Sequence, residues 1–277
     1  MRTFRLPSGQ SIPILGMGTW RMGEAASQRS AEIAALQHGL DLGITLIDTA
    51  EMYGEGGAET VIAEAIQDRR PSAFIVSKVY PHNASRQSAI AACERSLRRL
   101  KTDYLDLYLL HWRGSVPLSE TLEAFHTLKQ AGKIRDYGVS NFDVADMQKA
   151  AALPGGEAIA TNQVLYNLMR RGIEWDLLPW CRQYSIPIMA YSPVEQGRLL
   201  TNPTLQKIAQ QRGATPAQVA IAWLLQQENV IVIPKSSTIA HVEENRAALD
   251  LQLAPEDLSA LDTAFPPPAK RVALETL

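Results

Sequence analysis

Residues 104–141 read YLDLYLLHWRGSVPLSETLEAFHTLKQAGKIRDYGVSN and hold two short apolar runs on either side of an amphipathic segment. The runs at 105–110 and 134–139 have the length of strands rather than of helices. In the segment between them, apolar residues recur every three or four positions, as on one face of a helix: Leu118, Leu122, Phe125 and Leu128. A strand, a helix and a second strand in this order predict two parallel strands with a helix that covers them.

The same alternation continues along the whole chain and predicts eight strands. They are expected at residues 14–18, 44–47, 73–77, 105–110, 134–139, 158–162, 186–190 and 230–233. This order suits either a closed (β/α)8 barrel or an open, doubly wound parallel sheet. The count of eight and the length of 277 residues, close to the roughly 250 of a typical barrel, favour the α/β class with a (β/α)8 TIM barrel.

Breaks in the pattern indicate how the chain is divided. No linker rich in proline or serine is present, so residues 1–277 are expected to form a single domain. Thr215 followed by Pro216 predicts the start of a helix. Residues 3–14 predict an N-terminal β-hairpin that caps one end of the barrel. The three prolines at 266–268 should end the last helix and release an extended tail.

Composition argues against several classes of protein. The chain has 27 lysines and arginines against 29 aspartates and glutamates, a net charge of −2, which argues against a nucleic-acid partner. Cys93 and Cys181 lie far apart, so neither a disulfide framework nor a metal site is expected. The N-terminus has no apolar leader, and no run reaches the roughly 18 apolar residues of a membrane helix. We therefore expect a cytoplasmic protein with no membrane partner.

Polar side chains follow the predicted strands at their C-terminal ends, where a barrel gathers its working residues around one mouth. Each of them alone also suits a structural role, such as a turn cap for Asp48 or a satisfied core histidine for His111. Their presence after seven successive strands favours a common site. The residues are Asp48, Tyr53, Lys78, His111, Ser140, Asn141, Gln163, Tyr191, Lys235 and Ser236.

The first four of these residues indicate proton transfer to an oxygen atom. A tyrosine, with a pKa of about 10, is a poor acid at neutral pH unless a nearby cation stabilises its phenolate. Lys78 is expected to lower the pKa of Tyr53 in this way and to be held by an ion pair with Asp48. His111 would donate to a carbonyl oxygen and orient it toward Tyr53. No G-x-S-x-G elbow indicates acyl transfer instead.

Motifs along nearly the whole chain resemble those of the aldo-keto reductases. In order, they are LPSGQSIPILGMGTW (6–20), DTAEMYG (48–54), VSK (76–78), YLDLYLLHW (104–112), GKIRDYGVSN (132–141), TNQVLYN (161–167), AYSP (190–193) and IPKS (233–236). The resemblance implies that Asp48, Tyr53, Lys78 and His111 form the family's catalytic tetrad. It also implies that Tyr53 is the general acid and that the hydride comes from NADPH.

The resemblance further implies where the cofactor binds. Ser140, Asn141 and Gln163 correspond to ligands of the nicotinamide carboxamide, and Tyr191 corresponds to the aromatic side chain that stacks on the ring. The full set of expected cofactor residues is Gly18, Thr19, Trp20, Asp48, Ser140, Asn141, Gln163, Tyr191, Ser192, Pro193, Gly197, Lys235, Ser236, Ser237, His241, Glu244 and Asn245.

At the adenosine end, Lys235 and Ser236 precede a helix expected to begin around Ile239, where free N–H groups favour an anion. Glu244 and Asn245 correspond to adenine contacts, although both also suit a solvated helix face. The glycine-rich dinucleotide fingerprint G-x-G-x-x-G is absent, which argues against a Rossmann site.

Two positions depart from the family's pattern. Six residues after the lysine of IPKS the family often has an arginine that pairs with the 2′-phosphate of NADPH, and here that residue is His241. Imidazole is a weaker phosphate partner than guanidinium, so NADPH is expected with NADH also possible, and Arg246 is a candidate substitute. The segment GEGGAE (54–59) is longer and richer in glycine than the family's usual loop after the tyrosine.

The substrate is expected to be a small aldehyde or ketone. Trp20, Met22, Tyr80, His111 and Trp112 are the candidate substrate residues by their position, and the aromatic ones also suit packing. The loops that would surround the mouth are short, which favours an open site for small aldehydes. The resemblance is to bacterial members that reduce 2-oxoaldehydes such as methylglyoxal, and a monomer is expected.

Two alternatives stay open at the level of sequence. Lys78 or Lys235 could form a Schiff base, as in a barrel lyase of the aldolase type. The chain could also be a non-catalytic NADPH-binding module that senses redox state, although the complete tetrad speaks against it.

Overall fold

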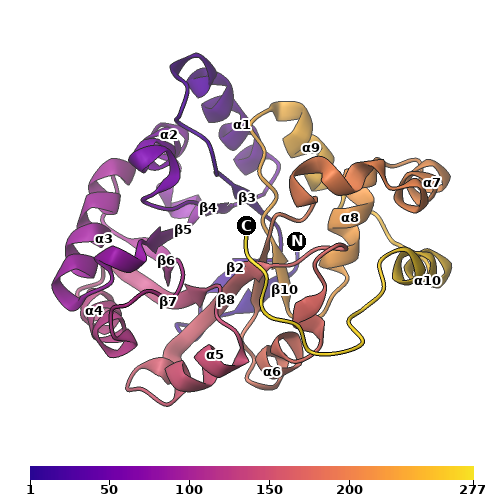
Figure 1. Cartoon of the computed structure of the whole chain (residues 1–277). Coiled ribbons are helices and arrows are strands. Elements are labelled where there is room, and N and C mark those ends of the chain that lie inside the picture. The colour runs from indigo at the N-terminus through magenta and orange to yellow at the C-terminus, as the bar shows by residue number, and fades with distance from the viewer.

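Eight parallel strands close into a barrel in the computed structural model, which describes residues 1–277 (Figure 1). The strands are β3 (Gly16–Gly18), β4 (Leu46–Asp48), β5 (Phe74–Val79), β6 (Leu105–Leu110), β7 (Ile134–Ser140), β8 (Ile159–Leu165), β9 (Ile188–Tyr191) and β10 (Val230–Val232). Each strand pairs with the next along the chain. The last strand meets the first through a parallel bridge between Leu15 and Val232, and the backbone N–H of Val232 donates to Ile14 over 2.8 Å.

The helices lie outside the barrel (Figure 1). They are α1 (Arg29–Asp41), α2 (Gly57–Ala65), α3 (Arg86–Leu100), α4 (Leu118–Gln130), α5 (Val144–Ala151), α6 (Leu177–Gln183), α7 (Pro203–Arg212), α8 (Pro216–Leu225), α9 (Ile239–Ala247) and α10 (Pro255–Ala264). The prediction of a (β/α)8 barrel with an N-terminal hairpin is therefore confirmed. None of these helices is both long and apolar enough to cross a membrane.

The apolar residues form two layers because neighbouring residues on a strand point to opposite faces of the sheet. The larger layer, with 64 buried residues, fills the space between the sheet and the surrounding helices. The smaller layer has 11 buried residues and includes side chains that point into the barrel, such as Leu46, Leu107 and Met189. The barrel is therefore filled with side chains, and ligands can reach only its ends.

The N-terminal hairpin closes the end of the barrel where the strands begin. It consists of β1 (Thr3–Arg5) and β2 (Ser11–Pro13), which pair in antiparallel fashion. Ile12 is fully buried in the inner layer. The turn of the hairpin is also tied by polar contacts, since Ser8 donates to the buried carboxylate of Asp136 through both its hydroxyl and its N–H. The hairpin does not cover the opposite end of the barrel, where the strands finish.

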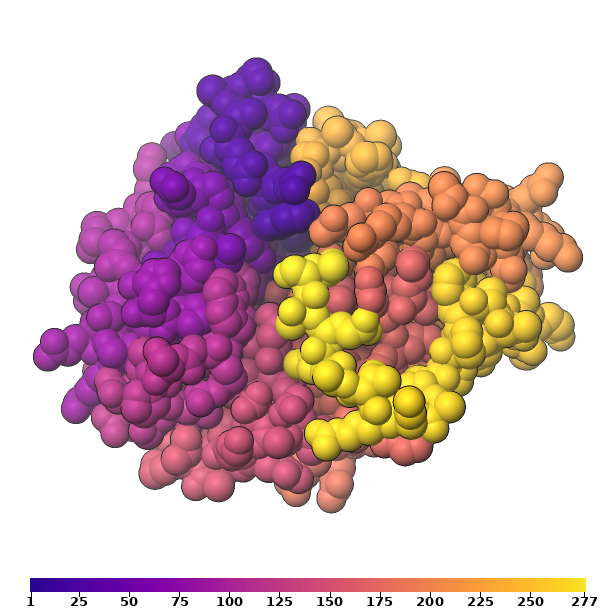
Figure 2. Space-filling model, in the orientation of Figure 1, coloured from indigo at the N-terminus to yellow at the C-terminus, as the bar shows by residue number.

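The C-terminal tail does not behave as the sequence suggested. Helix α10 ends before the three prolines as predicted, but the tail that follows is not released. It runs back across the open end of the barrel, and Figure 2 shows it lying over this face. Glu275 pairs with Arg170, Arg271 pairs with Asp176 at 2.9 Å, and the last residue, Leu277, lines the central cavity. The expectation of a mouth left open by short loops is therefore corrected.

Truncating Ile12 to alanine tests the structural role of the hairpin. We expect the free energy of unfolding to fall by about 2–5 kcal/mol, because a fully buried isoleucine leaves a cavity when it is shortened. Urea denaturation followed by circular dichroism measures this change. The half-exposed Ile239, changed to alanine, is the control and should shift the free energy by no more than about 0.5 kcal/mol. Equal effects of the two substitutions would contradict the assigned role.

Candidate active site

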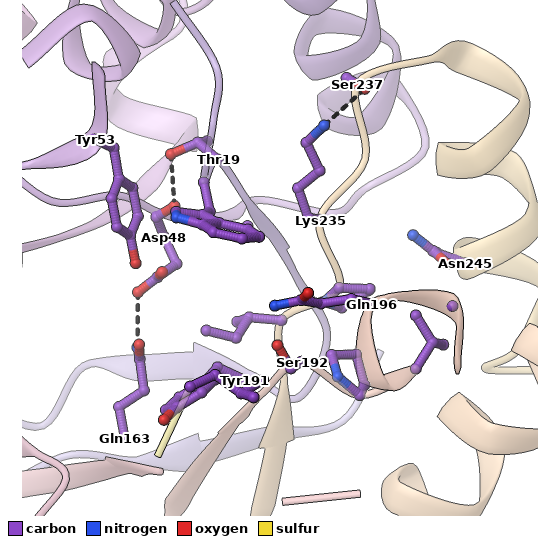
Figure 3. Close-up of a pocket in the computed structure, with 18 of the residues that line it drawn as sticks. Thr19, Asp48, Tyr53, Gln163, Tyr191, Ser192, Gln196, Lys235, Ser237 and Asn245 are labelled. Atoms are coloured by element: carbon purple, nitrogen blue, oxygen red, sulfur yellow. Dashed lines mark hydrogen bonds between the residues drawn. The ribbon is translucent and has the colours of Figure 1, made fainter. Parts of the chain in front are cut away.

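A cavity of about 630 Å³ opens at the C-terminal ends of the strands, between the barrel and the loops that follow it (Figure 3). Asp48, Gln163 and Tyr191, which lie on β4, β8 and β9, contribute to its floor. Trp20 and Trp112 line one part of it, and residues before and on α9 line another. The cavity therefore joins the acid–base side chains near Asp48 to the cationic side chains near Lys235.

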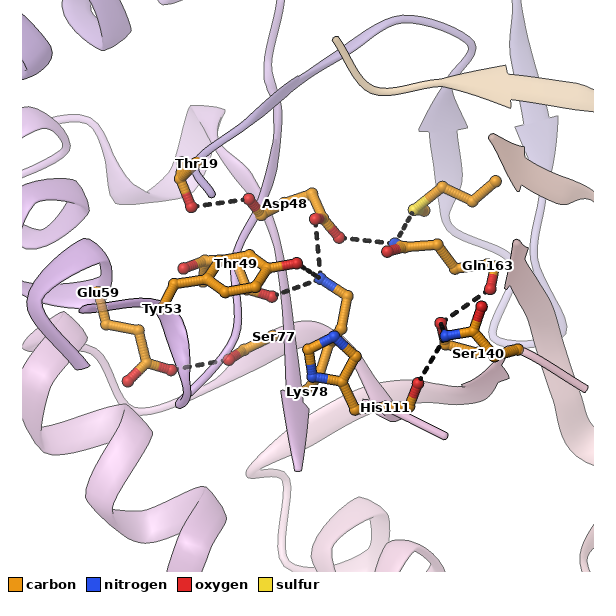
Figure 4. A network of polar contacts seen from close by, with 12 residues as sticks. Thr19, Asp48, Thr49, Tyr53, Glu59, Ser77, Lys78, His111, Ser140 and Gln163 are labelled. Carbon is orange, nitrogen blue, oxygen red and sulfur yellow. Dashed lines mark hydrogen bonds and ion pairs between the residues drawn. The ribbon is translucent and has the colours of Figure 1, made fainter. Parts of the chain in front are cut away.

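Lys78 is the centre of a buried polar network beside this cavity (Figure 4). Its side chain has no exposed surface and projects from β5. The ammonium Nζ donates to Oδ2 of Asp48 and to the backbone carbonyl of Thr49, both over 2.8 Å. A third, longer contact of 3.4 Å joins it to Oη of Tyr53. These three partners account for all three N–H bonds of the ammonium group.

This arrangement fixes the direction in which the phenol of Tyr53 can donate. An ammonium group has no acceptor, so in the contact between Lys78 and Tyr53 the phenol oxygen must accept. The hydrogen of the phenol therefore points away from Lys78. Tyr53 lines the cavity, so its hydrogen is available to a group bound there.

Burial and charge decide the protonation of these groups. Burial, with a smaller contribution from the negative charge of Asp48, raises the pKa of Tyr53 well above its ordinary value. The expectation of a lowered pKa is therefore corrected, because burial disfavours the charged phenolate. Burial also lowers the pKa of Lys78, against the opposing effect of its ion pair with Asp48. In this state Tyr53 holds its proton firmly.

His111 stands beside Tyr53 as a neutral imidazole. Burial, assisted by the positive charge of Lys78, lowers the pKa of His111 to about 2. The rings of His111 and Tyr53 meet edge to face with 5.9 Å between their centroids. Atom Nδ1 of His111 is buried and has no hydrogen-bond partner. A neutral imidazole has one donor and one acceptor nitrogen, so it can position a ligand oxygen without adding charge.

A second set of contacts links Asp48 to the strands on the far side of the barrel. Nε2 of Gln163 donates to Oδ1 of Asp48 over 2.7 Å (Figure 3). The amide oxygen of Gln163 takes no part in this contact. Ser140 donates to the backbone carbonyl of Gln163 over 2.8 Å. Tyr191 donates to the side chain of Asn141 over 3.0 Å, which fixes the tilt of its ring. These residues form an ordered polar floor with one aromatic side chain.

The loop after β9 covers the cavity from one side and is held by a buried carboxylate. Glu195 has no exposed surface and accepts hydrogen bonds from Asn167 at 2.8 Å and from Arg170 at 3.0 Å. Gln196 and Gly197 next to it have positive φ angles of 54° and 89°. Because Arg170 also pairs with Glu275, it links this loop to the C-terminal tail.

The other end of the cavity carries cationic and helical groups. Lys235 contacts the hydroxyl of Ser237 at 3.0 Å, and the hydroxyl of Thr238 caps α9 at its N-terminus. His241 lies in the first turn of this helix and lines the cavity. Arg246 is engaged elsewhere, since it pairs with Asp250 one turn further along the helix at 2.9 Å. A helix N-terminus with a nearby lysine is suited to an anionic group.

The cavity gathers most of the residues that the sequence singled out. Nineteen of them are among its 27 lining residues: Gly18, Thr19, Trp20, Asp48, Tyr53, His111, Trp112, Ser140, Asn141, Gln163, Tyr191, Ser192, Pro193, Gly197, Lys235, Ser237, His241, Glu244 and Asn245.

Four of the predicted site residues do not line the cavity. Lys78 lies behind Asp48 and Tyr53, to which it donates. Ser236 is buried and accepts a hydrogen bond from Asn245. Met22 is fully buried in the main apolar layer, and the ring of Tyr80 packs against Trp112 with 5.4 Å between centroids. The last two therefore support the site from behind.

Eight lining residues were missed by the sequence analysis. Most of them are apolar or lie next to a residue that was found, and no pattern of chemistry marks them. Leu277 carries no local signal at all, because its place depends on the docking of the whole tail. The eight are Met52, Val194, Gln196, Leu200, Ala217, Ile233, Pro234 and Leu277.

Comparisons with known proteins agree with this geometry. The chain is 56% identical over 270 residues to methylglyoxal reductase YeaE of Escherichia coli (strain K12), a match that covers 96% of this chain and 95% of the relative. A crystal structure of an aldo/keto reductase from Klebsiella pneumoniae in complex with NADP and acetate has 51% identity and a TM-score of 0.97, with 99% of both chains covered. Another from Klebsiella pneumoniae, in complex with NADPH, has 50% identity and a TM-score of 0.97, covering 100% of this chain and 99% of the other.

The sequence also matches a defined protein family over residues 14–265, which include all eight strands of the barrel. By this match and by its relatives, the chain belongs to the aldo/keto reductase family.

Proposed function

We propose that the protein reduces small aldehydes, including 2-oxoaldehydes such as methylglyoxal, to alcohols with NADPH and with Tyr53 as the proton donor. The observation that carries this proposal is the contact from Lys78 to Tyr53, because it turns the phenol hydrogen into the cavity. The name of the E. coli relative and the NADPH-bound Klebsiella structure support the choice of substrate and cofactor.

The residues of the cavity fit the cofactor from end to end. At one end, the amide oxygen of Gln163 and the side chains of Ser140 and Asn141 offer partners for a carboxamide, and Tyr191 offers a face for the nicotinamide ring. At the other end, Lys235 and the N-terminus of α9 suit the phosphates. Bound there, NADPH supplies the hydride that reaches the carbonyl carbon of the substrate.

The protein's own groups then manage the proton. Tyr53 and His111 line the same part of the cavity, so both can donate to the carbonyl oxygen of a bound aldehyde. As negative charge develops on that oxygen, Tyr53 gives up its proton. The ammonium of Lys78, 3.4 Å from the phenol oxygen, stabilises the phenolate that remains. The ion pair with Asp48 favours the charged form of Lys78 and so opposes the effect of burial on its pKa.

The walls of the cavity near Tyr53 favour a small substrate. Trp20, Trp112, Met52 and Leu277 line this region, and the docked tail narrows it. Apolar and aromatic walls with two convergent donors suit a compact carbonyl compound.

The geometry counts against a Schiff-base lyase that uses Lys78. A Schiff base needs a free amine that a substrate can reach, but Lys78 is fully buried and all three of its N–H bonds are directed at partners. Borohydride treatment in the presence of substrate would label such a lysine.

Four expectations from the sequence stay predictions. They are a single domain over residues 1–277, a monomeric state, a cytoplasmic location and, as the alternative function, a non-catalytic role.

Replacing Tyr53 by phenylalanine tests the proton donor. We expect kcat for methylglyoxal to fall by about 10²–10⁴-fold, since the general acid is lost, while the Kd for NADPH changes less than about twofold. Initial rates of NADPH oxidation and a fluorescence titration measure the two quantities. Tyr184, an exposed tyrosine, changed to phenylalanine serves as the control. Loss of NADPH binding in parallel with kcat would contradict the role of Tyr53 as an acid.

The lowered pKa of His111 predicts how the free energy of unfolding depends on pH. Its pKa is about 2 in the folded protein against 6.5 ordinarily, so the unfolded chain binds the proton more tightly between these values. Its contribution to stability is full above pH 6.5 and is lost as the pH falls toward 2.

We therefore expect the free energy of unfolding to fall more steeply in the wild type than in His111→Gln as the pH is lowered. The difference in slope should approach about 1.4 kcal/mol per pH unit below about pH 5.5. Urea denaturation at a series of pH values measures both slopes. Parallel slopes would show that His111 is not buried in its neutral form.

Position 241 tests the choice of cofactor. We propose that NADPH is preferred but that NADH is also accepted, because His241 provides a weaker phosphate partner than arginine. The variant His241→Arg should bind NADPH about tenfold more tightly and NADH with unchanged Kd, since only NADPH carries the 2′-phosphate. Fluorescence titration with each cofactor gives both constants. An equal gain for NADH would place the phosphate elsewhere.

A further inference from the structure

Two glycines of the turn that follows Tyr53, Gly56 and Gly57, are packed too tightly to accept side chains. This turn, residues 54–57, joins Tyr53 to α2. A Cβ atom on Gly57 would lie 2.7 Å from the carbonyl oxygen of Gly23, and one on Gly23 would lie 2.3 Å from the backbone of Gly57. The two backbones therefore touch directly. The extra glycines noted in the sequence therefore fit this turn into a narrow space.

The same turn also contacts an arginine from a different helix. A Cβ atom on Gly56, which has a φ angle of 91°, would lie 2.5 Å from both Cδ and Nε of Arg99 on α3. The turn is thus in close contact with both the Gly23 backbone and the Arg99 side chain. Arg99 does not line the cavity and contacts none of the groups assigned to proton transfer.

Arg99 is itself fixed by a fully buried carboxylate. Its Nε donates to Oε2 of Glu59 over 2.6 Å, and its terminal nitrogen donates to Ser96 over 3.2 Å. The other oxygen of Glu59 accepts from the hydroxyl of Ser77 over 2.7 Å, and neither Glu59 nor Ser77 has exposed surface (Figure 4). Buried charges of this kind hold one geometry, because each lost contact would leave an unpaired group.

These contacts close a ring around the proton donor. Ser77 directly precedes Lys78 on β5, and Lys78 contacts the phenol oxygen of Tyr53. From Ser77 the contacts lead through Glu59 and Arg99 back to the turn that begins at Tyr53. The side chain of Tyr53 is therefore placed relative to β5 at its hydroxyl end and at its backbone end.

We infer that Arg99, held by Glu59, is a positioning residue that keeps Tyr53 in reach of Lys78 and of the substrate carbonyl. This inference rests on the proposed function. A displacement of about 1 Å is enough to cost a reaction up to about 10²-fold, so a support on an outer helix can influence the chemistry. Arg99 acts through the backbone of the turn and touches no reacting atom.

The variant Arg99→Met tests this inference, because methionine places Sδ and Cε where arginine has Cδ and Nε, so it keeps the packing against the turn and removes the contact to Glu59. We expect kcat for methylglyoxal to fall by about ten- to hundredfold, while KM for the aldehyde and Kd for NADPH change by less than about twofold. The deuterium isotope effect with NADPH labelled at the transferred position should rise, since the chemical step then limits the rate. Arg99→Lys, which keeps the charge, should recover part of kcat.

A matched control separates positioning from stability. Arg212 on α7 donates through Nε to the buried Asp257 of α10 over 2.7 Å, and neither residue lines the cavity. Arg212→Met should lower Tm about as much as Arg99→Met but leave kcat unchanged at a temperature well below both transitions. If Arg99→Met does not fold, Glu59→Gln gives the same comparison, because glutamine preserves the shape and removes the charge.

The outcomes distinguish the two claims. The positioning role alone would be overturned if the wild type is active and Tyr53→Phe is inactive, but Arg99→Met has the kcat of the wild type. Equal loss of kcat in Arg99→Met and Arg212→Met would also overturn it, since both effects would then follow from stability. A wild type that reduces no aldehyde would overturn the proposed function and the inference with it.

Discussion

The buried ammonium of Lys78 is the group on which the rest of the site depends. A charge without access to water is costly unless every one of its donors meets a partner, so the three acceptors around Lys78 must stand at fixed positions. Asp48 and Thr49 come from the end of β4, and the parallel register pairs Asp48 with Val76 on β5, two residues before Lys78. Closing the barrel thus assembles the ion pair, and the ion pair in turn orients the phenol of Tyr53.

The carboxylate of Asp48 extends this order across the mouth of the barrel. One of its oxygens binds Lys78 and the other binds Gln163 on β8, so a single side chain joins the proton donor to the floor on which the nicotinamide is proposed to lie. The neutral state of His111 complements this arrangement. A protonated imidazole next to Lys78 would place two cations side by side, and burial together with Lys78 holds its pKa near 2. The site therefore contains one cation, one anion and two neutral donors.

Sequence patterns predicted the strands and most of the cavity because both depend on local rules. Apolar runs mark β6 and β7, and residues at or just after the C-terminal ends of strands, such as Lys78 and His111, follow the geometry of the barrel. Other features depend on contacts between distant segments. Leu277 lies in a tail that pairs with Arg170 through Glu275, Met22 and Ser236 are buried in the folded chain, and the pKa of Tyr53 is raised by its burial and by the charge of Asp48. No pattern within a short window contains that information.

The most direct test of the central claim is a crystal structure of the protein with NADP⁺ and a small alcohol product. The account predicts that the hydroxyl oxygen of the product lies about 3 Å from both Oη of Tyr53 and a ring nitrogen of His111, with Lys78 still bound to Asp48. A product oxygen bound elsewhere in the cavity, or a Tyr53 side chain turned away from it, would contradict the account.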